Sequence, residues 1–106
     1  RDGSGAWVAE GEWIVGLAAW RMGDCETAAD AFQRTAGRST NSELTAAGHY
    51  WASRALIRCR APEKAAEQLR GAARHDETLY GMLAREQLGQ ALPRTHAAAD
   101  FTQQDW

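Results

Sequence analysis

The stretch that decides the fold is Trp13–Ala36, with the sequence WIVGLAAWRMGDCETAADAFQRTA. Its apolar residues recur at the three- and four-residue spacing of a helix, and this spacing predicts a first helix over Ala6–Met22. Gly23 follows as a stop signal, because glycine enters the left-handed conformation at a helix C-terminus without strain. Asp24 is a favourable N-cap residue for a second helix over Cys25–Ala36. The stretch therefore predicts two helices joined by a tight turn.

The same pattern recurs 37 residues later, so that Glu12–Ala36 can be laid over His49–Ala73. Both segments have the order helix, tight turn, helix. A hairpin of this kind leaves one apolar face open, so the repetition predicts hairpins that stack on one another. The matched pairs are Trp13 with Tyr50, Ala18 with Ala55, Ala28 with Ala65, Phe32 with Leu69 and Ala36 with Ala73.

Small and large residues have separate roles in this repeat. Gly16, Ala18 and Ala28 are expected where two antiparallel helices approach closely, because a bulky side chain there would force them apart. Phe32 and Leu69 are expected to fill the gap between one hairpin and the next. The pattern thus predicts which residues form the helix contacts.

Three more helices are predicted from their end signals. Thr40 and Glu43 have the spacing of a capping box. Pro62 suits the first turn of a helix, and Asp76 is an N-cap residue. The predicted helices run from that capping box to about Cys59, from Glu63 to Arg74 and from Glu77 to Leu88, and Gly37 and Gly89 end the second and the fifth helix.

We therefore predict an all-α fold, an α-α superhelix of helical hairpins with about five helices over residues 1–89. Residues 90–106 have a weak pattern and are predicted to be a linker towards a downstream domain. Arg1 opens the sequence with neither a Met nor a signal-peptide pattern, so we expect a processed or excised piece.

The composition supports this fold class and excludes others. The chain has 106 residues, of which 22 are alanine and only four are Ile or Val, so a sheet protein is excluded. No apolar run reaches the roughly 18 residues that a membrane helix needs. The formal net charge of −2, with Arg and Glu interspersed, does not predict binding to nucleic acid or to an anionic membrane.

Two levels of resemblance follow from the repeats. The segment WRMGDCETAADAF (20–32) resembles a tetratricopeptide repeat, and the second copy is degenerate because Arg60-Ala61-Pro62 replaces the Gly-Asp turn. The segments GLAAWRMGD, GHYWASRALIR, PEKAAEQLRGAAR and LYGMLAREQLG together resemble the helical superhelix that precedes the catalytic domain of soluble lytic murein transglycosylases. The most specific parts of this resemblance are Tyr50–Ala55 and Tyr80–Gly89.

The resemblance implies a periplasmic location, a lysozyme-like catalytic domain further along the chain and peptidoglycan as the eventual substrate. That family's catalytic domain carries its acid–base Glu in a Glu-Ser-x-aromatic motif, and no Glu of this chain is followed by Ser. No catalytic residue can therefore be carried over. The resemblance implies a scaffold without the chemistry, and we expect no cofactor.

The candidate binding residues are aromatic, aliphatic and Arg side chains expected to line the concave side of the array. Such residues suit sugar rings and peptide carboxylates, through stacking and bidentate hydrogen bonds. The alternative, which we favour for Trp13 and Trp20 as for Trp7 and Trp51, is packing against the next helix. The predicted groove residues are Trp13, Leu17, Trp20, Arg21, Tyr50, Arg54 and Arg58.

The Cys and His residues do not predict a metal site. Cys25 and Cys59 are too few for a disulfide framework and lack Cys-x-x-Cys spacing. We expect Cys25 to be a buried packing residue, with a Cys25–Cys59 disulfide as the alternative in an oxidising compartment. His49, His75 and His96 lack the three- or four-residue spacing of helical metal ligands, so surface or capping roles are expected.

Two functions follow from the sequence. The first is a non-catalytic scaffold segment of a periplasmic lytic transglycosylase, which positions the catalytic domain of the same chain and can contact glycan. The second is a free-standing adaptor of the tetratricopeptide type that binds an extended peptide through Trp13, Arg21 and Arg54.

Overall fold

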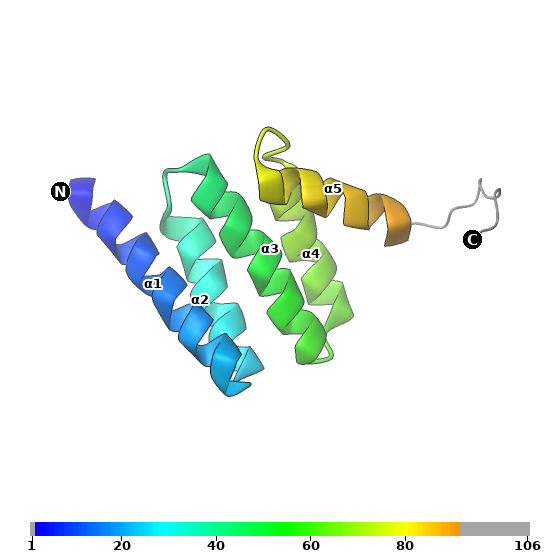
Figure 1. The fold of residues 1–106 in the computed structure, drawn as a ribbon, viewed down its shortest axis with the longest axis horizontal. Coiled ribbons are helices and arrows are strands. Elements are labelled where there is room, and N and C mark those ends of the chain that lie inside the picture. Colours follow the sequence, from blue (N-terminus) through cyan, green and yellow to red (C-terminus); the bar gives the residue numbers. More distant parts are fainter. Residues whose placement is uncertain (1, 92–106) are drawn as a thin grey trace.

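A computed structural model describes residues 2–91, with the side chains of residues 8–89. Helices lie side by side in chain order from α1 to α4, and α5 begins beside α3 and α4 and runs at an angle to them (Figure 1). The all-α prediction is confirmed, whereas the superhelix remains a prediction, and most of the expected linker lies outside the described residues. The five helices in the described part are α1 (Asp2–Met22), α2 (Cys25–Arg38), α3 (Ser42–Arg58), α4 (Pro62–Ala73) and α5 (Leu79–Ala91).

The turns inside the two hairpins have the same backbone geometry. In the first turn, Gly23 N–H donates to the Trp20 carbonyl and Asp24 N–H donates to that of Ala19. The second turn repeats both bonds 37 residues later, with Arg60 donating to Ile57 and Ala61 donating to Leu56. Gly23 has a φ of 79° and Arg60 a φ of 63°, so both turns use the left-handed conformation. The change from Gly-Asp to Arg-Ala leaves the turn intact.

The residue that caps the following helix also recurs at the 37-residue offset. Asn41 caps α3, because its Oδ1 accepts from the N–H groups of Glu43 and Leu44 at 2.8 and 3.1 Å. Thr78 stands 37 residues later, and its Oγ1 accepts from Gly81 N–H at 2.9 Å while donating to the His75 carbonyl at 2.7 Å. The cap of α5 therefore lies at the same 37-residue offset from the cap of α3.

These caps correct the predicted helix ends. Thr40 does not cap α3, and α5 begins at Leu79 rather than at Glu77. Asp76 instead forms an ion pair with Arg85, at 2.7 Å between its Oδ2 and the Arg Nη1. α2 continues past Gly37 and α5 past Gly89, since glycine ends a helix only where the left-handed conformation is required, as at Gly23.

The first core lies between α1, α2 and α3, around the fully buried Phe32. Its ring lies 5.3 Å from that of Trp13 and 6.3 Å from that of Trp51, measured between centroids. A Cβ atom on Gly16 would lie 2.5 Å from the Phe32 ring, and one on Gly48 would lie 2.8 Å from the Phe32 carbonyl oxygen. The predicted roles of Gly16 and Phe32 are confirmed.

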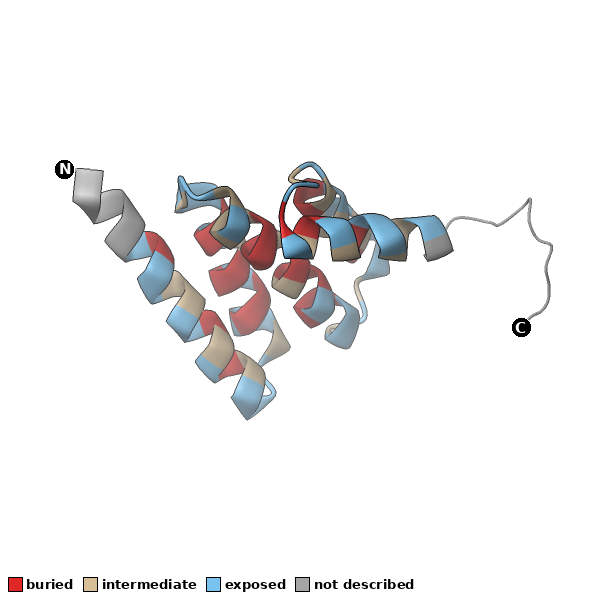
Figure 2. Ribbon diagram, turned by 45° about the horizontal axis from the view of Figure 1, so that its top comes forward, coloured by how far each residue is buried: buried red, intermediate tan, exposed pale blue. Residues whose placement is uncertain are grey.

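The expectation for Ala18 is wrong. Ala18 is exposed, whereas its counterpart Ala55 is completely buried. Ala55 lies on α3, which packs against both α2 and α4. The extensive contact of α1 is with α2. Figure 2 shows this difference, because buried segments crowd the middle helices while α1 is largely exposed or intermediate.

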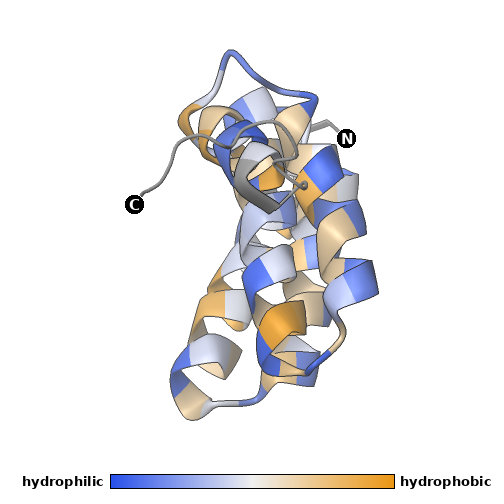
Figure 3. Ribbon diagram, turned by 90° about the vertical axis from the view of Figure 1, so that its right-hand side faces the viewer, coloured by the Kyte–Doolittle hydropathy of each residue, from blue (hydrophilic) through white to orange (hydrophobic). Residues whose placement is uncertain are grey.

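A second core joins α3, α4 and α5. Tyr50 is buried, its ring centroid lies 5.1 Å from that of Tyr80, and its hydroxyl oxygen accepts from Gln87 Nε2 at 2.8 Å. Leu69 packs at the edge of this cluster and is only half-buried. Viewed from the α5 end, hydrophobic and hydrophilic residues alternate around the helices, as expected where a helix buries one stripe (Figure 3).

A disulfide joins the first residue of α2 to the C-cap of α3. The Cα atoms of Cys25 and Cys59 lie 5.6 Å apart, within the usual range for a disulfide. Both residues are half-buried, so the expectation of an unpaired, buried Cys25 is wrong. The two residues meet because each lies at a turn and the two turns pack side by side. Within the described residues, no helix has the length and apolar character needed to cross a membrane.

Candidate functional site

The candidate site is a groove of about 490 Å³ at the ends of α1 and α3, closed by α4 and α5. This volume falls in the range of small-molecule sites. Its lining is apolar along α4 and carries two guanidinium groups along α3. The lining residues are Trp20, Ser53, Arg54, Ile57, Arg58, Pro62, Ala65, Ala66, Leu69, Gln87 and Leu88.

Two tryptophan rings position the two arginines of the groove. Trp20 of α1 and Trp51 of α3 meet edge to face, with centroids 5.3 Å apart and an interplanar angle of 84°. Arg58 Cζ lies 4.0 Å from the Trp20 ring centroid. Arg54 Cζ lies 5.3 Å from the Trp51 centroid and 6.0 Å from that of Trp20.

These cation–π contacts leave N–H donors of the arginines available. The guanidinium group carries several N–H donors, and its contact with an aromatic ring depends on its positive charge. Each stacked pair is worth about 0.5–1 kcal/mol at an exposed site. Arg54 and Arg58 are both exposed, so their donors can reach a carboxylate or a sugar hydroxyl in the groove.

The rest of the groove suits an apolar group. Pro62, Ala65 and Leu69 present short apolar side chains from α4, and Leu88 closes the groove from α5. A ligand with an anionic or hydroxyl-rich end and an apolar body would satisfy both parts of the lining. The arrangement can bind and orient such a ligand.

The structure separates the predicted groove residues into two groups. Trp20, Arg54 and Arg58 come together and line the groove. Trp13 packs on Phe32, as the packing alternative expected, and Leu17 packs against the same core. Tyr50 lies in the second core, and Arg21 is exposed on α1 without lining the groove.

Sequence reasoning missed the α4 and α5 side of the groove. Ala65 and Leu69 were expected only as packing residues of the repeat. Gln87 lies 37 residues after Tyr50, so extension of the repeat into a third unit could have placed it beside the second core. No sequence signal singled out Pro62 or Leu88 as groove residues.

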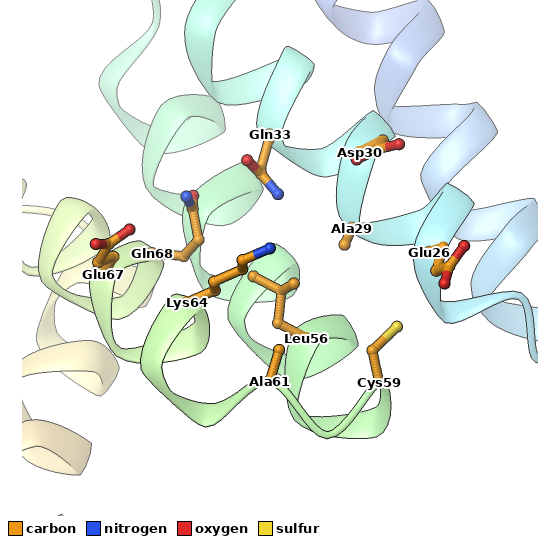
Figure 4. A pocket seen from close by; sticks show the side chains of 10 residues that line it. All are labelled: Glu26, Ala29, Asp30, Gln33, Leu56, Cys59, Ala61, Lys64, Glu67 and Gln68. Carbon is orange, nitrogen blue, oxygen red and sulfur yellow. The ribbon is translucent and has the colours of Figure 1, made fainter.

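A second cleft of about 650 Å³ lies between α2 and α4 (Figure 4). Glu26, Asp30, Lys64 and Glu67 on its rim are all exposed. Figure 4 shows the Lys64 side chain extending from α4 into the space between the helices. Unlike the groove beside Trp20, this cleft has no aromatic side chain among the residues that line it.

The titratable groups with shifted pKa values lie outside the groove. Burial lowers the pKa of His49, and the hydrogen bond between its Nδ1 and Gln68 Oε1, 2.8 Å long, offsets part of that effect. Hydrogen bonds from Thr27 lower the pKa of Asp24, the cap of α2. Both groups support the helices, and neither faces a ligand.

Outside the groove, one acidic residue joins two helices through ion pairs. Glu12 lies between Arg34 and Arg38, with N–O distances of 2.9 and 3.3 Å, in an ion-pair cluster that links α1 to α2. Among the described residues, no group of three His, Cys, Asp or Glu side chains lies close enough to hold a metal ion. His96 lies outside the described residues.

Comparison of the chain with protein-family profiles, with curated proteins and with solved structures found no match.

Proposed function

We propose that this chain is a non-catalytic helical-repeat scaffold belonging to a peptidoglycan-cleaving lytic transglycosylase of the bacterial envelope. The supporting observation is that the two segments that carry the resemblance contact each other. Tyr50, which opens the first segment, packs on Tyr80, which opens the second, with ring centroids 5.1 Å apart. Gln87 of the second segment also donates a hydrogen bond to the Tyr50 hydroxyl at 2.8 Å.

The glycine after Tyr80 has a physical reason as well. A Cβ atom at Gly81 would collide with the His75 carbonyl, so only glycine allows the chain to enter α5 in this way. The contacts of Tyr50 with Tyr80 and Gln87, together with Gly81, thus hold α5 against α3. A rigid joint at this position suits a scaffold that holds a downstream domain in one orientation.

The Cys25–Cys59 disulfide supports an envelope location. Disulfides form and persist in oxidising compartments such as the bacterial periplasm, and they are rare in the cytosol. The cross-link also joins the first hairpin to the second covalently, which stiffens the array.

In this proposal the groove is a contact surface. Arg54 and Arg58 present N–H donors beside the Trp20 ring, and these donors can bind the hydroxyl groups of a sugar. The scaffold acts by geometry: it holds the catalytic domain and guides the glycan strand along the groove.

The test is a titration of the full chain, followed by tryptophan fluorescence, with a purified disaccharide-peptide fragment of peptidoglycan and with short acidic peptides. We expect a response to the peptidoglycan fragment and none to the peptides. Arg54→Ala should weaken the response, and Arg21→Ala is the matched control because Arg21 is exposed on α1 outside the groove. A saturable micromolar response to the peptides that Arg54→Ala weakens, without any response to glycan, would contradict the proposal.

A second test uses the gene. If the proposal is right, the coding sequence downstream of Trp106 encodes a domain with a Glu-Ser-x-aromatic motif within roughly a hundred residues, a domain-sized distance. A stop codon directly after Trp106 would exclude the scaffold.

The groove also favours a second candidate, a peptide-binding adaptor of the tetratricopeptide type. The apolar floor from Pro62 to Leu69, with two guanidinium groups at one end, suits a peptide that carries a carboxylate next to apolar side chains. The peptide arm of the titration distinguishes this candidate from the scaffold.

A further inference from the structure

One face of α1 is apolar and exposed from Val8 to Met22. Its residues recur at spacings of three and four, so they lie on a single helix face. Met22 is 80% exposed, Ile14 64% and Val15 45%. We call this surface the open face of α1, and it consists of Val8, Gly11, Ile14, Val15, Ala18 and Met22.

The counterparts of these residues on α3 are covered by a helix. Ala52 and Ala55, which correspond to Val15 and Ala18, are completely buried. A Cβ atom on Gly48 would lie 2.8 Å from the Phe32 carbonyl of α2, whereas a Cβ atom on its counterpart Gly11 would meet nothing within 4 Å. α2 therefore packs on this side of α3. We call it the covered face of α3, and it consists of Thr45, Gly48, Trp51, Ala52, Ala55 and Cys59.

The opposite side of α1 is apolar as well. Trp13, Gly16 and Leu17 pack against the first core. A helix that carries apolar residues on two opposite sides is typical of one buried between two neighbours. α3 occupies that environment in this chain, with α2 on one side and α4 on the other.

We propose that the open face of α1 binds a partner helix with the α2 pattern, supplied by a further helical hairpin of the same repeat type. That pattern places small residues one turn before and after a single large apolar side chain, as Ala28, Phe32 and Ala36 do in α2. The backbone of the partner helix lies against Gly11, as that of α2 lies against Gly48. The start of the partner helix lies beside Met22, because Cys25 at the start of α2 bonds to the equivalent Cys59.

Among the helices that the structure describes, a second copy of this chain offers no free helix with the α2 pattern. α2 is already seated on α3, and α4, which carries the pattern as Ala65, Leu69 and Ala73, is seated against α5. The occupant is therefore a different hairpin. This inference uses the repeat alone and does not depend on the groove or on the proposed function.

The test traps the partner helix with a thiol. A synthetic peptide that copies residues 24–38 is the probe, with its Cys25 activated as a 2-pyridyl disulfide. The variant Met22→Cys supplies the thiol, because both natural cysteines are bonded to each other. The thiolate introduced at position 22 attacks the peptide sulfur, a new disulfide forms, and pyridine-2-thiolate leaves and is measured by its absorbance as the thione.

The control is Arg21→Cys, which places a thiol one residue away on another face of the same helix end. A small activated disulfide, 2-pyridyl-cysteamine, measures the intrinsic reactivity of each thiol. After this correction, we expect the α2 peptide to react at least tenfold faster with Met22→Cys than with Arg21→Cys. The peptide variant Phe32→Ala, or the protein variant Val15→Glu combined with Met22→Cys, should remove the preference.

Two results would overturn the proposal. Equal corrected rates at positions 21 and 22 would mean that the open face does not select a helix. A chain that sediments as a dimer, with the thiol of Met22→Cys protected in proportion to that dimer, would mean that a second copy is the occupant.

Discussion

The α1–α2 and α3–α4 hairpins have the same local structure but different neighbours. Their turns share each backbone hydrogen bond at an offset of 37 residues, including the bonds made by Gly23 and Arg60. The first hairpin leaves α1 open on one side, whereas the second is covered by α2 on one side and by α5 on the other. Burial in this chain is thus decided by position in the array, and the unit itself determines only the backbone.

The largest expected difference concerns the side chain that fills each hairpin. Phe32 is completely buried between two tryptophan rings, and its counterpart Leu69 is half-buried. Phe32→Ala should reduce the free energy of unfolding by about 3–5 kcal/mol, and Leu69→Ala by about 2 kcal/mol or less. Urea unfolding followed by circular dichroism measures both. Equal losses would mean that the two hairpins have equivalent cores.

The next effect concerns the covalent link between the hairpins. Cys25 and Cys59 are separated by 34 residues, and closing a loop of this size restricts the unfolded chain. The double variant Cys25→Ser/Cys59→Ser should lose about 3–4 kcal/mol of unfolding free energy. The reduced natural chain is the control and should unfold at the same urea concentration as the double variant. If reduction leaves the midpoint unchanged, the disulfide does not constrain the array.

The two equivalent glycines should respond with opposite signs. Gly48→Ala introduces a Cβ atom 2.8 Å from the Phe32 carbonyl oxygen and 2.9 Å from the Ala36 nitrogen, so α2 and α3 must separate. We expect a loss of about 1–3 kcal/mol. Gly11→Ala meets open space and should add about 0.5–1 kcal/mol, since alanine favours a helix. A gain from both variants would contradict the close contact between α2 and α3.

The next difference is the pH response at positions 12 and 49. Glu12 forms ion pairs with α2, whereas its counterpart His49 is a half-buried imidazole whose pKa is lowered by burial. Below pH 6.5 the His49 imidazole is therefore protonated more readily in the unfolded chain than in the folded chain. Stability should fall as the pH drops from 6.5 through the lowered pKa of His49, by at most about 1.4 kcal/mol per pH unit for one proton.

The variant His49→Gln isolates this contribution. It should flatten the dependence of the urea midpoint on pH below 6.5, whereas His75→Gln serves as the control on the same chain. An unchanged slope in His49→Gln would mean that His49 is protonated equally in the folded and unfolded states.

The smallest effect compares the N-cap residues of α2 and α4. Asp24 caps α2 through a 3.1 Å hydrogen bond from Thr27 N–H, whereas the equivalent Ala61 has no side-chain cap. Asp24→Ala should cost about 1 kcal/mol. Ala61→Asp should raise the free energy of unfolding by less than that amount, because the turn before α4 has the same backbone hydrogen bonds and the new carboxylate can cap α4. Thermal unfolding of both variants checks the pair, and destabilisation by Ala61→Asp would show that the turns differ.

Much of the fold could be predicted from the sequence because its signals are local. The Gly-Asp turn and the helical spacing are properties of neighbouring residues, and the 37-residue offset can be read by comparing two segments of the sequence. Together they identified the helices and the role of Phe32. The caps at Asn41 and Thr78 were missed because Thr40 and Asp76, which lie close to them, are also residue types that cap helices. Their shared offset of 37 residues would have identified both.

The errors come from features that depend on neighbours. Ala18 and Ala55 have the same residue type and helix position, and only the helix that packs on Ala55 distinguishes them. Trp13 and Trp20 both pack against the first core, as favoured from the sequence, but Trp20 also lines the groove, and this difference depends on where Phe32 and Arg58 lie. The disulfide depends on how two turns pack side by side, which sequence spacing does not report.

The most direct test of the repeated unit is the backbone angle of Arg60 in solution. A positive φ is uncommon for arginine, so its presence there would mean that the second turn copies the first despite its different sequence. NMR scalar couplings across the N–Cα bond, with the intraresidue amide-to-Hα NOE, measure the sign of φ. We predict a positive φ at Arg60, matching that of Gly23. A negative φ at Arg60 would mean that the second hairpin is built differently, and it would contradict the 37-residue unit.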